Sequence, residues 1–161
     1  MAEHDAQLVN FNYNDLPIFE LNFDGYWCVA KPVKVYDGDT VTLVWYSYTH
    51  MNYIKMNCRM ANYDTCEMRG GTEEEKRKAI EMRDYLTSLI CDCSNKDVKT
   101  CNKKLVRVRF FKNEPKYKRP LICLFDINET NLSFENSINC KMMEKFNLSA
   151  YNPSNLDFRF K

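Results

Sequence analysis

The sequence predicts an α+β, mainly β protein: a five-stranded OB-type barrel with one helix between strands 3 and 4 and a second helix after strand 5. Two observations predict this fold. Five short segments have the apolar and polar pattern of strands, and two segments have the apolar spacing and caps of helices. The 161 residues suffice for one domain and are too few for two, and a hydrophobic content of 45% fills a core.

We divide the chain into an N-terminal extension over residues 1–25, an OB-fold domain over 26–152 and a short C-terminal tail over 153–161. The first 24 residues are polar and aromatic and have no clear period, which is typical of an extension. The chain contains no internal repeat and no low-complexity tract. One folded domain is therefore expected.

The first three strands are expected at residues 26–36, 41–46 and 54–60. Pro32 within the first segment indicates a bulge or an edge position, because proline cannot donate to a sheet ladder. Asp37-Gly38 between the first two segments is a strong signal for a hairpin turn. These strands are expected to form consecutive neighbours in the sheet.

A helix is expected after Gly70-Gly71, because Thr72 and Glu75 have the spacing of a capping box. Its apolar stripe reaches Ile90, and a polar loop is expected at residues 92–103. The fourth strand is expected at 106–110, with Arg107 and Arg109 on its outer face. The fifth is expected at 121–127, and the second helix at 137–146.

The charge balance excludes nucleic-acid binding through bulk charge, since 23 Lys and Arg face 22 Asp and Glu. Residues 103–119 nevertheless hold eight Lys and Arg against one acid, Glu114. This run is read either as a solvated strand and loop or as a track for a nucleic-acid backbone. No apolar run reaches 18 residues and the start is not that of a signal peptide, so we expect no membrane contact and an intracellular location.

The eight cysteines are expected to be free thiols in a reducing compartment. Cys58 and Cys123 fall within apolar strand segments, where a thiol packs as a small hydrophobic group. Cys91, Cys93 and Cys101 form the one cluster, but their spacing is not that of a common zinc site. A zinc-stabilised protein is the weakest of the hypotheses considered.

A group of acidic and basic residues near the strand ends suits phosphodiester chemistry. Carboxylate oxygens hold hard cations such as Ca²⁺, and a carboxylate left off the metal can act as a general base on water. Guanidinium groups bind phosphoryl oxygens in a bidentate manner. The alternative for the same residues is a set of solvated or ion-paired surface side chains. The group consists of Asp39, Asp64, Glu67, Arg59 and Arg119.

Three segments resemble, in order and spacing, the signature blocks of the staphylococcal nuclease (thermonuclease-like) family. They are Val-Tyr-Asp-Gly-Asp-Thr-Val at 35–41, Arg59 with Asp-Thr-Cys-Glu at 64–67, and Lys-Tyr-Lys-Arg at 116–119. The resemblance extends over roughly residues 28–151. The family usually has proline where this chain has Cys66, and glycines where it has Lys118 and Pro120.

The resemblance implies a role for each residue of these blocks. Asp39, Asp64 and the backbone carbonyl of Thr65 would bind Ca²⁺ or another divalent cation. Glu67 would orient or deprotonate the attacking water. The other implied roles are phosphate binding by Arg59 and Arg119, nucleotide contacts by Tyr117, Lys118 and Tyr151, a position beside the metal ligands for Asp37, and a structural role for Asn139.

These residues are consistent with two functions. The first is a monomeric, metal-dependent nuclease that cleaves DNA and/or RNA with little sequence preference and leaves 3′-phosphate ends, as the resemblance implies. The second is a non-catalytic OB-fold module that binds single-stranded nucleic acid or a protein partner. The complete set of charged residues favours the nuclease. The departures at Cys66, Lys118 and Pro120 favour the binding module.

Overall fold

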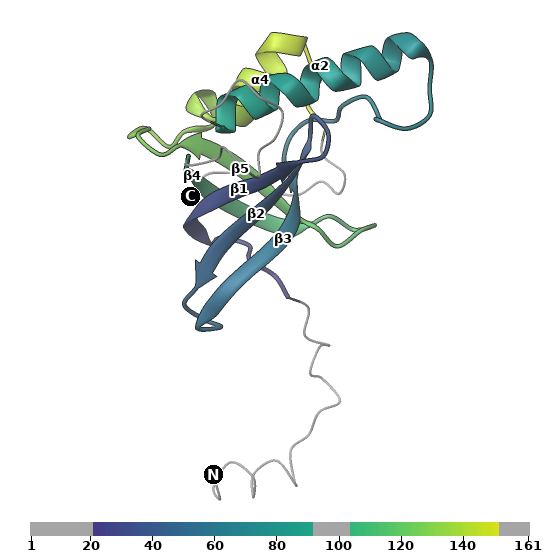
Figure 1. The fold of residues 1–161 in the computed structure, drawn as a ribbon. Coiled ribbons are helices and arrows are strands. Elements are labelled where there is room, and N and C mark those ends of the chain that lie inside the picture. The colour runs from purple at the N-terminus through teal and green to yellow at the C-terminus, as the bar shows by residue number, and fades with distance from the viewer. Residues whose placement is uncertain (1–20, 92–103, 152–161) are drawn as a thin grey trace, which may run out of the picture.

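The structure, a computed structural model, describes residues 21–91 and 104–151. Most of the expected N-terminal extension, the polar loop at 92–103 and the C-terminal tail lie outside the described residues. Within them, the chain forms five strands and two α-helices with one short 3₁₀ turn (Figure 1). In chain order these are β1 (Trp27–Val35), β2 (Thr40–Ser47), β3 (Asn52–Met60), α2 (Glu73–Ile90), β4 (Val106–Asn113), β5 (Pro120–Asp126), η1 (Phe134–Asn136) and α4 (Ile138–Phe146).

The strands close into a barrel in the order β1-β2-β3-β5-β4, with β4 pairing back onto β1. All neighbours are antiparallel except β3 and β5, which pair in parallel over only two residue pairs. One helix lies between β3 and β4 and the second follows β5. The predicted α+β, mainly β fold with an OB-like barrel is confirmed.

The expected strand boundaries are right to within about three residues, and the deviations have local causes. The register of β1 against β2 shifts between Pro32 and Lys34, so the bulge indicated by Pro32 is present. β4 continues to Asn113, three residues beyond the predicted end. A second register shift, between Phe110 and Asn113, breaks the alternation from which that end was predicted.

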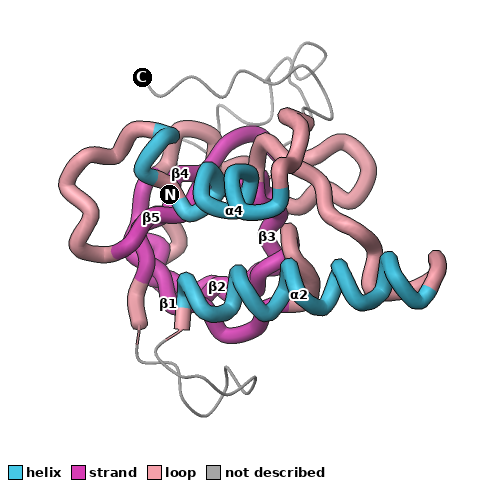
Figure 2. The backbone as a smooth tube through the Cα atoms, turned by 90° about the horizontal axis from the view of Figure 1, so that it is seen from above, coloured by secondary structure: helices cyan, strands magenta, loops and turns pink. Residues whose placement is uncertain are grey.

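Both helices lie over one end of the barrel, as Figure 2 shows from above. Helix α2 begins with the expected capping box, in which Thr72 and Glu75 each accept a hydrogen bond from the other's backbone N–H. The helix buries Ala79, Met82, Leu86 and Ile90 against the core. Burying each of its larger apolar side chains contributes roughly 1.5–3 kcal/mol.

Asn139 in the first turn of α4 joins this helix to the sheet where β3 and β5 diverge. Its buried amide donates to the backbone oxygens of Ala61 and Ile122, at 3.0 Å each. Its side-chain oxygen accepts from the N–H of Leu124 at 3.0 Å. The amide thus satisfies backbone groups beside the short parallel β3–β5 pairing.

The loop between β1 and β2 closes a hairpin, as Asp37-Gly38 predicted. Gly38 does not have a positive φ. A Cβ at this position would lie 2.8 Å from Cβ of Met82 and 2.9 Å from Cγ2 of Thr65. Glycine is therefore required because α2 and the loop after β3 pack directly against this backbone.

Candidate active site

A cleft of about 460 Å³ opens where four separate chain segments meet at the barrel surface. The segments are the β1–β2 loop with the start of β2, the end of β3, the loop between β3 and α2, and the β4–β5 loop. Each brings polar side chains that the fold alone does not require. The cleft is lined by Tyr36, Asp37, Asp39, Thr40, Arg59, Glu67, Tyr117 and Arg119.

Asp39 is held at the base of this cleft by hydrogen bonds from three directions. Its backbone N–H donates to Oδ1 of Asp37 at 3.1 Å, as in an Asx turn. Its Oδ1 accepts from the hydroxyl of Thr40 at 3.0 Å. Its Oδ2 accepts from both the backbone N–H and the hydroxyl of Thr65, each at 3.1 Å. The carboxylate is therefore fixed between the β1–β2 loop and the loop after β3.

The charge of Asp39 is poorly compensated. Burial, followed by the charge of neighbouring Asp37, raises the pKa of Asp39 to about 7. The attraction of Arg59 opposes this rise without cancelling it. Both carboxylates are at least nine-tenths buried. An additional cation at this point would therefore stabilise the ionised form of Asp39.

Arg59, at the end of β3, links the two predicted metal-ligand carboxylates. Its Nη2 lies 3.4 Å from Oδ2 of Asp39 and donates a hydrogen bond to Oδ1 of Asp64. The guanidinium carbon also lies 5.6 Å from the centre of the Tyr151 ring. The backbone N–H of Tyr151 donates to the oxygen of Asn62 at 2.7 Å, which anchors this ring near the cleft.

Arg119 projects into the cleft although Pro120 follows it directly. Its Nη1 donates to the hydroxyl of Thr40 at 3.1 Å, and its Nε donates to Oε1 of Glu114. The ring of Tyr117, whose residue is 61% exposed, lies 5.2 Å from the guanidinium carbon. The proline begins β5 and leaves the preceding side chain in reach of the cleft.

Glu114 is a residue of the site that the sequence analysis missed. It is 5% exposed, it accepts from Arg119, and its Oε2 lies 4.0 Å from Nε of Arg59. The sequence contained one relevant signal: Glu114 is the single acid in a run of eight Lys and Arg. A buried carboxylate needs cationic partners, so it orients both guanidinium groups.

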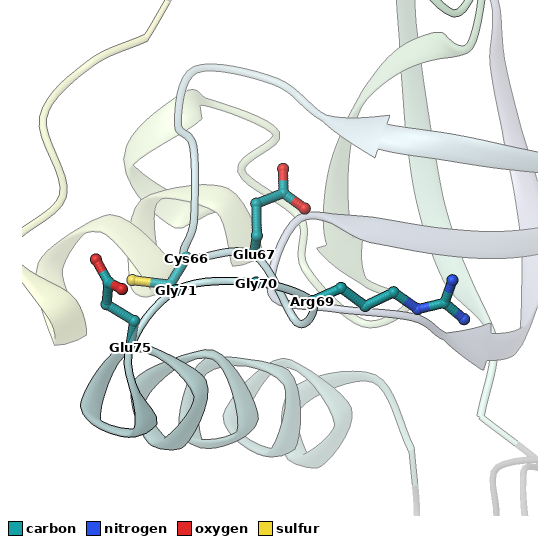
Figure 3. A pocket seen from close by; sticks show the side chains of 6 residues that line it. All are labelled: Cys66, Glu67, Arg69, Gly70, Gly71 and Glu75. Atoms are coloured by element: carbon teal, nitrogen blue, oxygen red, sulfur yellow. The ribbon is translucent and has the colours of Figure 1, made fainter.

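Glu67 lies in the loop between β3 and α2, and its side chain is exposed. It borders the cleft and also a second cavity of about 270 Å³ next to the start of α2. Figure 3 shows its carboxylate projecting from the loop away from α2, while Cys66 and Glu75 lie at the helix start. Glu67 is thus a carboxylate at the solvent side of the cleft, where a water molecule has access.

Of the predicted site residues, six line the cleft directly, and three others border it through their contacts with Arg59 or Asp39. Lys118 is not among the lining residues. It adopts a φ of 55°, and its N–H donates to the oxygen of Glu114 at 3.1 Å. Lys118 therefore takes the left-handed turn position that commonly favours glycine. The six predicted residues that line the cleft are Asp37, Asp39, Arg59, Glu67, Tyr117 and Arg119. The three that border it are Asp64, Thr65 and Tyr151.

The cleft offers two carboxylates, Asp39 and Asp64, as oxygen ligands for a divalent cation. Within residues 21–91 and 104–151, no group of three or more His, Cys, Asp or Glu side chains forms a ready metal site. Asp39 and Asp64 nevertheless approach the same positive group, Nη2 of Arg59, from two different loops. Their oxygens are hard ligands of the type that Ca²⁺ prefers. The residues therefore fit such an ion by chemistry.

The basic run at 103–119 does not form one exposed surface, at least over its described residues. Arg109 was expected on the outer face, but it is only 8% exposed. Its guanidinium carbon lies 5.6 Å from the Trp27 ring centre and 5.3 Å from that of Phe111. Arg107 is exposed and donates to the oxygen of Ile127. Aromatic neighbours from β1 and β4 cover Arg109, which local alternation cannot reveal.

No family model matches this chain, and no curated protein sequence matches it. In the part of the chain that the structure describes, no helix has the length and apolar character needed to cross a membrane.

Proposed function

We propose that the protein is a metal-dependent nuclease, with Ca²⁺ as the expected metal, that hydrolyses phosphodiester bonds of DNA and/or RNA with little sequence preference. One observation carries the proposal. Two guanidinium groups, a buried carboxylate pair and an exposed carboxylate from four separate segments line a single cleft. This is the set of groups that phosphodiester hydrolysis requires. The resemblance to the staphylococcal nuclease family supports the same assignment.

Arg59 and Arg119 bind the scissile phosphate in this proposal. Their guanidinium groups lie on either side of the same buried carboxylate, Glu114, and both border the cleft. Fixed guanidinium groups stabilise the charge that develops on the phosphoryl oxygens in the transition state. Tyr117 and Tyr151, each beside one of these arginines, flank the nucleotide.

Glu67 acts as the general base. It accepts a proton from water as the water oxygen attacks phosphorus, and the bond from phosphorus to the 5′-oxygen breaks. The 5′-oxygen leaves with a proton from solvent, and the other product keeps a 3′-phosphate. The exposure of Glu67 at the cleft suits this role, because the attacking water must enter from solvent.

The carboxylates of Asp39 and Asp64 and the backbone carbonyl of Thr65 would hold the metal, with Asp37 beside them. When bound, it supplies positive charge that polarises the phosphate. The raised pKa of Asp39 supports this placement, since burial and Asp37 leave its carboxylate short of compensating charge. The hydrogen bonds from Thr65 to Asp39 keep the two loops together.

The alternative is a non-catalytic module that binds single-stranded nucleic acid. It is favoured by the pairing of both cleft arginines with carboxylates, Arg59 with Asp64 and Arg119 with Glu114. Such pairs reduce the charge that each arginine can offer to the transition state of hydrolysis. Cleavage activity distinguishes the two functions, because both predict binding.

The test is cleavage of labelled single-stranded DNA and RNA by the purified protein, with Ca²⁺ and then with excess chelator. Glu67→Gln removes the base and keeps its shape, so cleavage is expected to fall at least about a hundredfold while binding persists. Glu81→Gln, an exposed position on α2, is the matched control and should cleave like the wild type. Wild-type binding without metal-dependent cleavage would instead establish the alternative.

A further inference from the structure

The outer face of the β2–β3 pair runs without interruption from the cleft to the far end of the hairpin. Side chains alternate between the two faces of a strand, so every second cross-strand pair shares this face. Arg59 and Thr40 from the cleft belong to it. The four pairs, which we call the ladder face, are Thr40 with Arg59, Thr42 with Asn57, Val44 with Lys55, and Tyr46 with Tyr53.

The far end of the ladder face is an exposed cluster of tyrosines. The Tyr46 ring lies 5.1 Å from that of Tyr48 and 5.3 Å from that of Tyr53, at 78° and 77° respectively. Tyr48 is 76% and Tyr53 is 73% exposed. In Figure 1 this end of β2 and β3 lies opposite α2 and α4, and neither helix covers it. Three grouped aromatic rings, of which Tyr46 is half-buried and the other two are exposed, are more than the stability of a hairpin end requires.

The charge of this surface has one sign. Strands β1, β2 and β3 contain three lysines and Arg59 but no Asp or Glu. Lys31, Lys34 and Lys55 are exposed, and Lys55 lies on the ladder face between the arginine and the tyrosines. This is the charge complement of a phosphate backbone.

We propose that the ladder face binds a single strand of nucleic acid that continues out of the cleft, with phosphates at Arg59 and Lys55 and bases stacked on Tyr46, Tyr53 and Tyr48. From Arg59 to Tyr53 the strand rises about 20 Å at about 3.3 Å per residue, enough for several nucleotides. Stacking on tyrosine requires unpaired bases, so the substrate class is single-stranded. The inference rests on the proposed function, because the nucleic acid is taken to enter the ladder face from the cleft.

The test is equilibrium binding of a labelled oligonucleotide of about 12 nucleotides, a length within the range that one OB fold covers. Excess chelator prevents cleavage during the measurement. Tyr46→Ala combined with Tyr53→Ala is expected to weaken binding by about tenfold or more, because two stacking surfaces are lost. Lys55→Glu is expected to weaken binding and to make its salt dependence shallower. Since Lys55 is exposed, this second variant tests the surface even if the tyrosine variant fails to fold.

Lys141→Glu is the matched charge control, an exposed lysine on α4 away from the ladder face, and should bind like the wild type. A duplex of the same sequence should be affected less by the tyrosine changes than the single strand. If folded tyrosine variants and Lys55→Glu bind the single strand as the wild type does, the inference is wrong, whatever the cleavage assay shows. If they bind weakly while the wild type binds but does not cleave, the ladder face stands and the nuclease proposal fails.

Discussion

Nε of Arg119 donates a hydrogen bond to the buried carboxylate of Glu114, and Nη1 of the same guanidinium donates to Thr40. The hydrogen bond from Arg119 to Thr40 ties the end of the β4–β5 loop to the start of β2. The other oxygen of Glu114 lies 4.0 Å from Nε of Arg59, so one buried carboxylate faces both cleft arginines. Glu114 is therefore a positioning residue for the two groups that bind phosphate.

Replacing Glu114 by Gln should impair substrate binding more than it impairs the chemical step. If the displaced arginine loses one hydrogen bond to the charged phosphate, which contributes about 1.5–3 kcal/mol, KM is expected to rise by about tenfold or more. The measurement is the separation of KM from kcat on single-stranded DNA, with the free energy of unfolding measured alongside. Glu114→Asp keeps the charge and should restore part of the binding. A variant that loses stability but keeps the wild-type KM would show a purely structural role.

Asp39 should make the metal-free protein less stable as the pH rises. Burial and Asp37 raise its pKa in the folded state to about 7, above that of the unfolded chain, so folding takes up a proton. The stabilising protonation is complete below the unfolded pKa, near 4, and is lost as the pH rises through about 7. Urea unfolding in chelator, at several pH values, measures this.

The contribution of Asp39 is isolated by comparison with Asp39→Asn, which cannot ionise. As the pH increases from about 4 to 7, the unfolding free energy of the wild type should fall relative to that of the variant. Added Ca²⁺ should stabilise the wild type at pH 8 and leave the variant nearly unchanged. A difference that does not vary with pH would contradict the raised pKa.

Gly38→Ala should destabilise the fold through steric overlap. The new Cβ would lie 2.8 Å from Cβ of Met82 and 2.9 Å from Cγ2 of Thr65, which forces α2 and the loop after β3 apart. Such overpacking costs about 1–3 kcal/mol of unfolding free energy. Gly70→Ala is the control, because its φ of +84° adds backbone strain but no atom lies within 4 Å. Gly38→Ala should also reduce cleavage, and equal activity of both variants would count against this packing.

Asn139→Ala should cost about 2–4 kcal/mol of unfolding free energy, since three backbone groups each lose a buried hydrogen bond at once, although the oxygen of Ile122 keeps the N–H of Ala61 as a donor. The side chain contacts Ala61, Ile122 and Leu124. Urea titration measures the loss, and Asn131→Ala, an exposed asparagine near η1, should change stability by less than about 0.5 kcal/mol. If both variants unfold at the same urea concentration, Asn139 does not hold α4 to the sheet.

The helices and strands could be predicted from the sequence because the signals that start, end and shape them act between residues close in the chain. The capping box of Thr72 and Glu75, the bulge at Pro32 and the alternation of β2 depend on residues a few positions apart. Charged residues near the predicted strand ends, with the family resemblance, pointed to residues that line the cleft, among them Asp39, Arg59 and Arg119.

The sequence by itself determined the order of strands and helices and the types of charged residue in the cleft, because periodicity, caps and turn signals act over short distances. Tertiary structure decided the burial of Glu114 between two arginines, the covering of Arg109 by Trp27 and Phe111, and the need for glycine at position 38. It also placed the tyrosines of the β2–β3 hairpin on the face that leads to the cleft. The first three depend on neighbours that the folding of the barrel and its helices brings together, and burial and charge pairing are properties of such contacts.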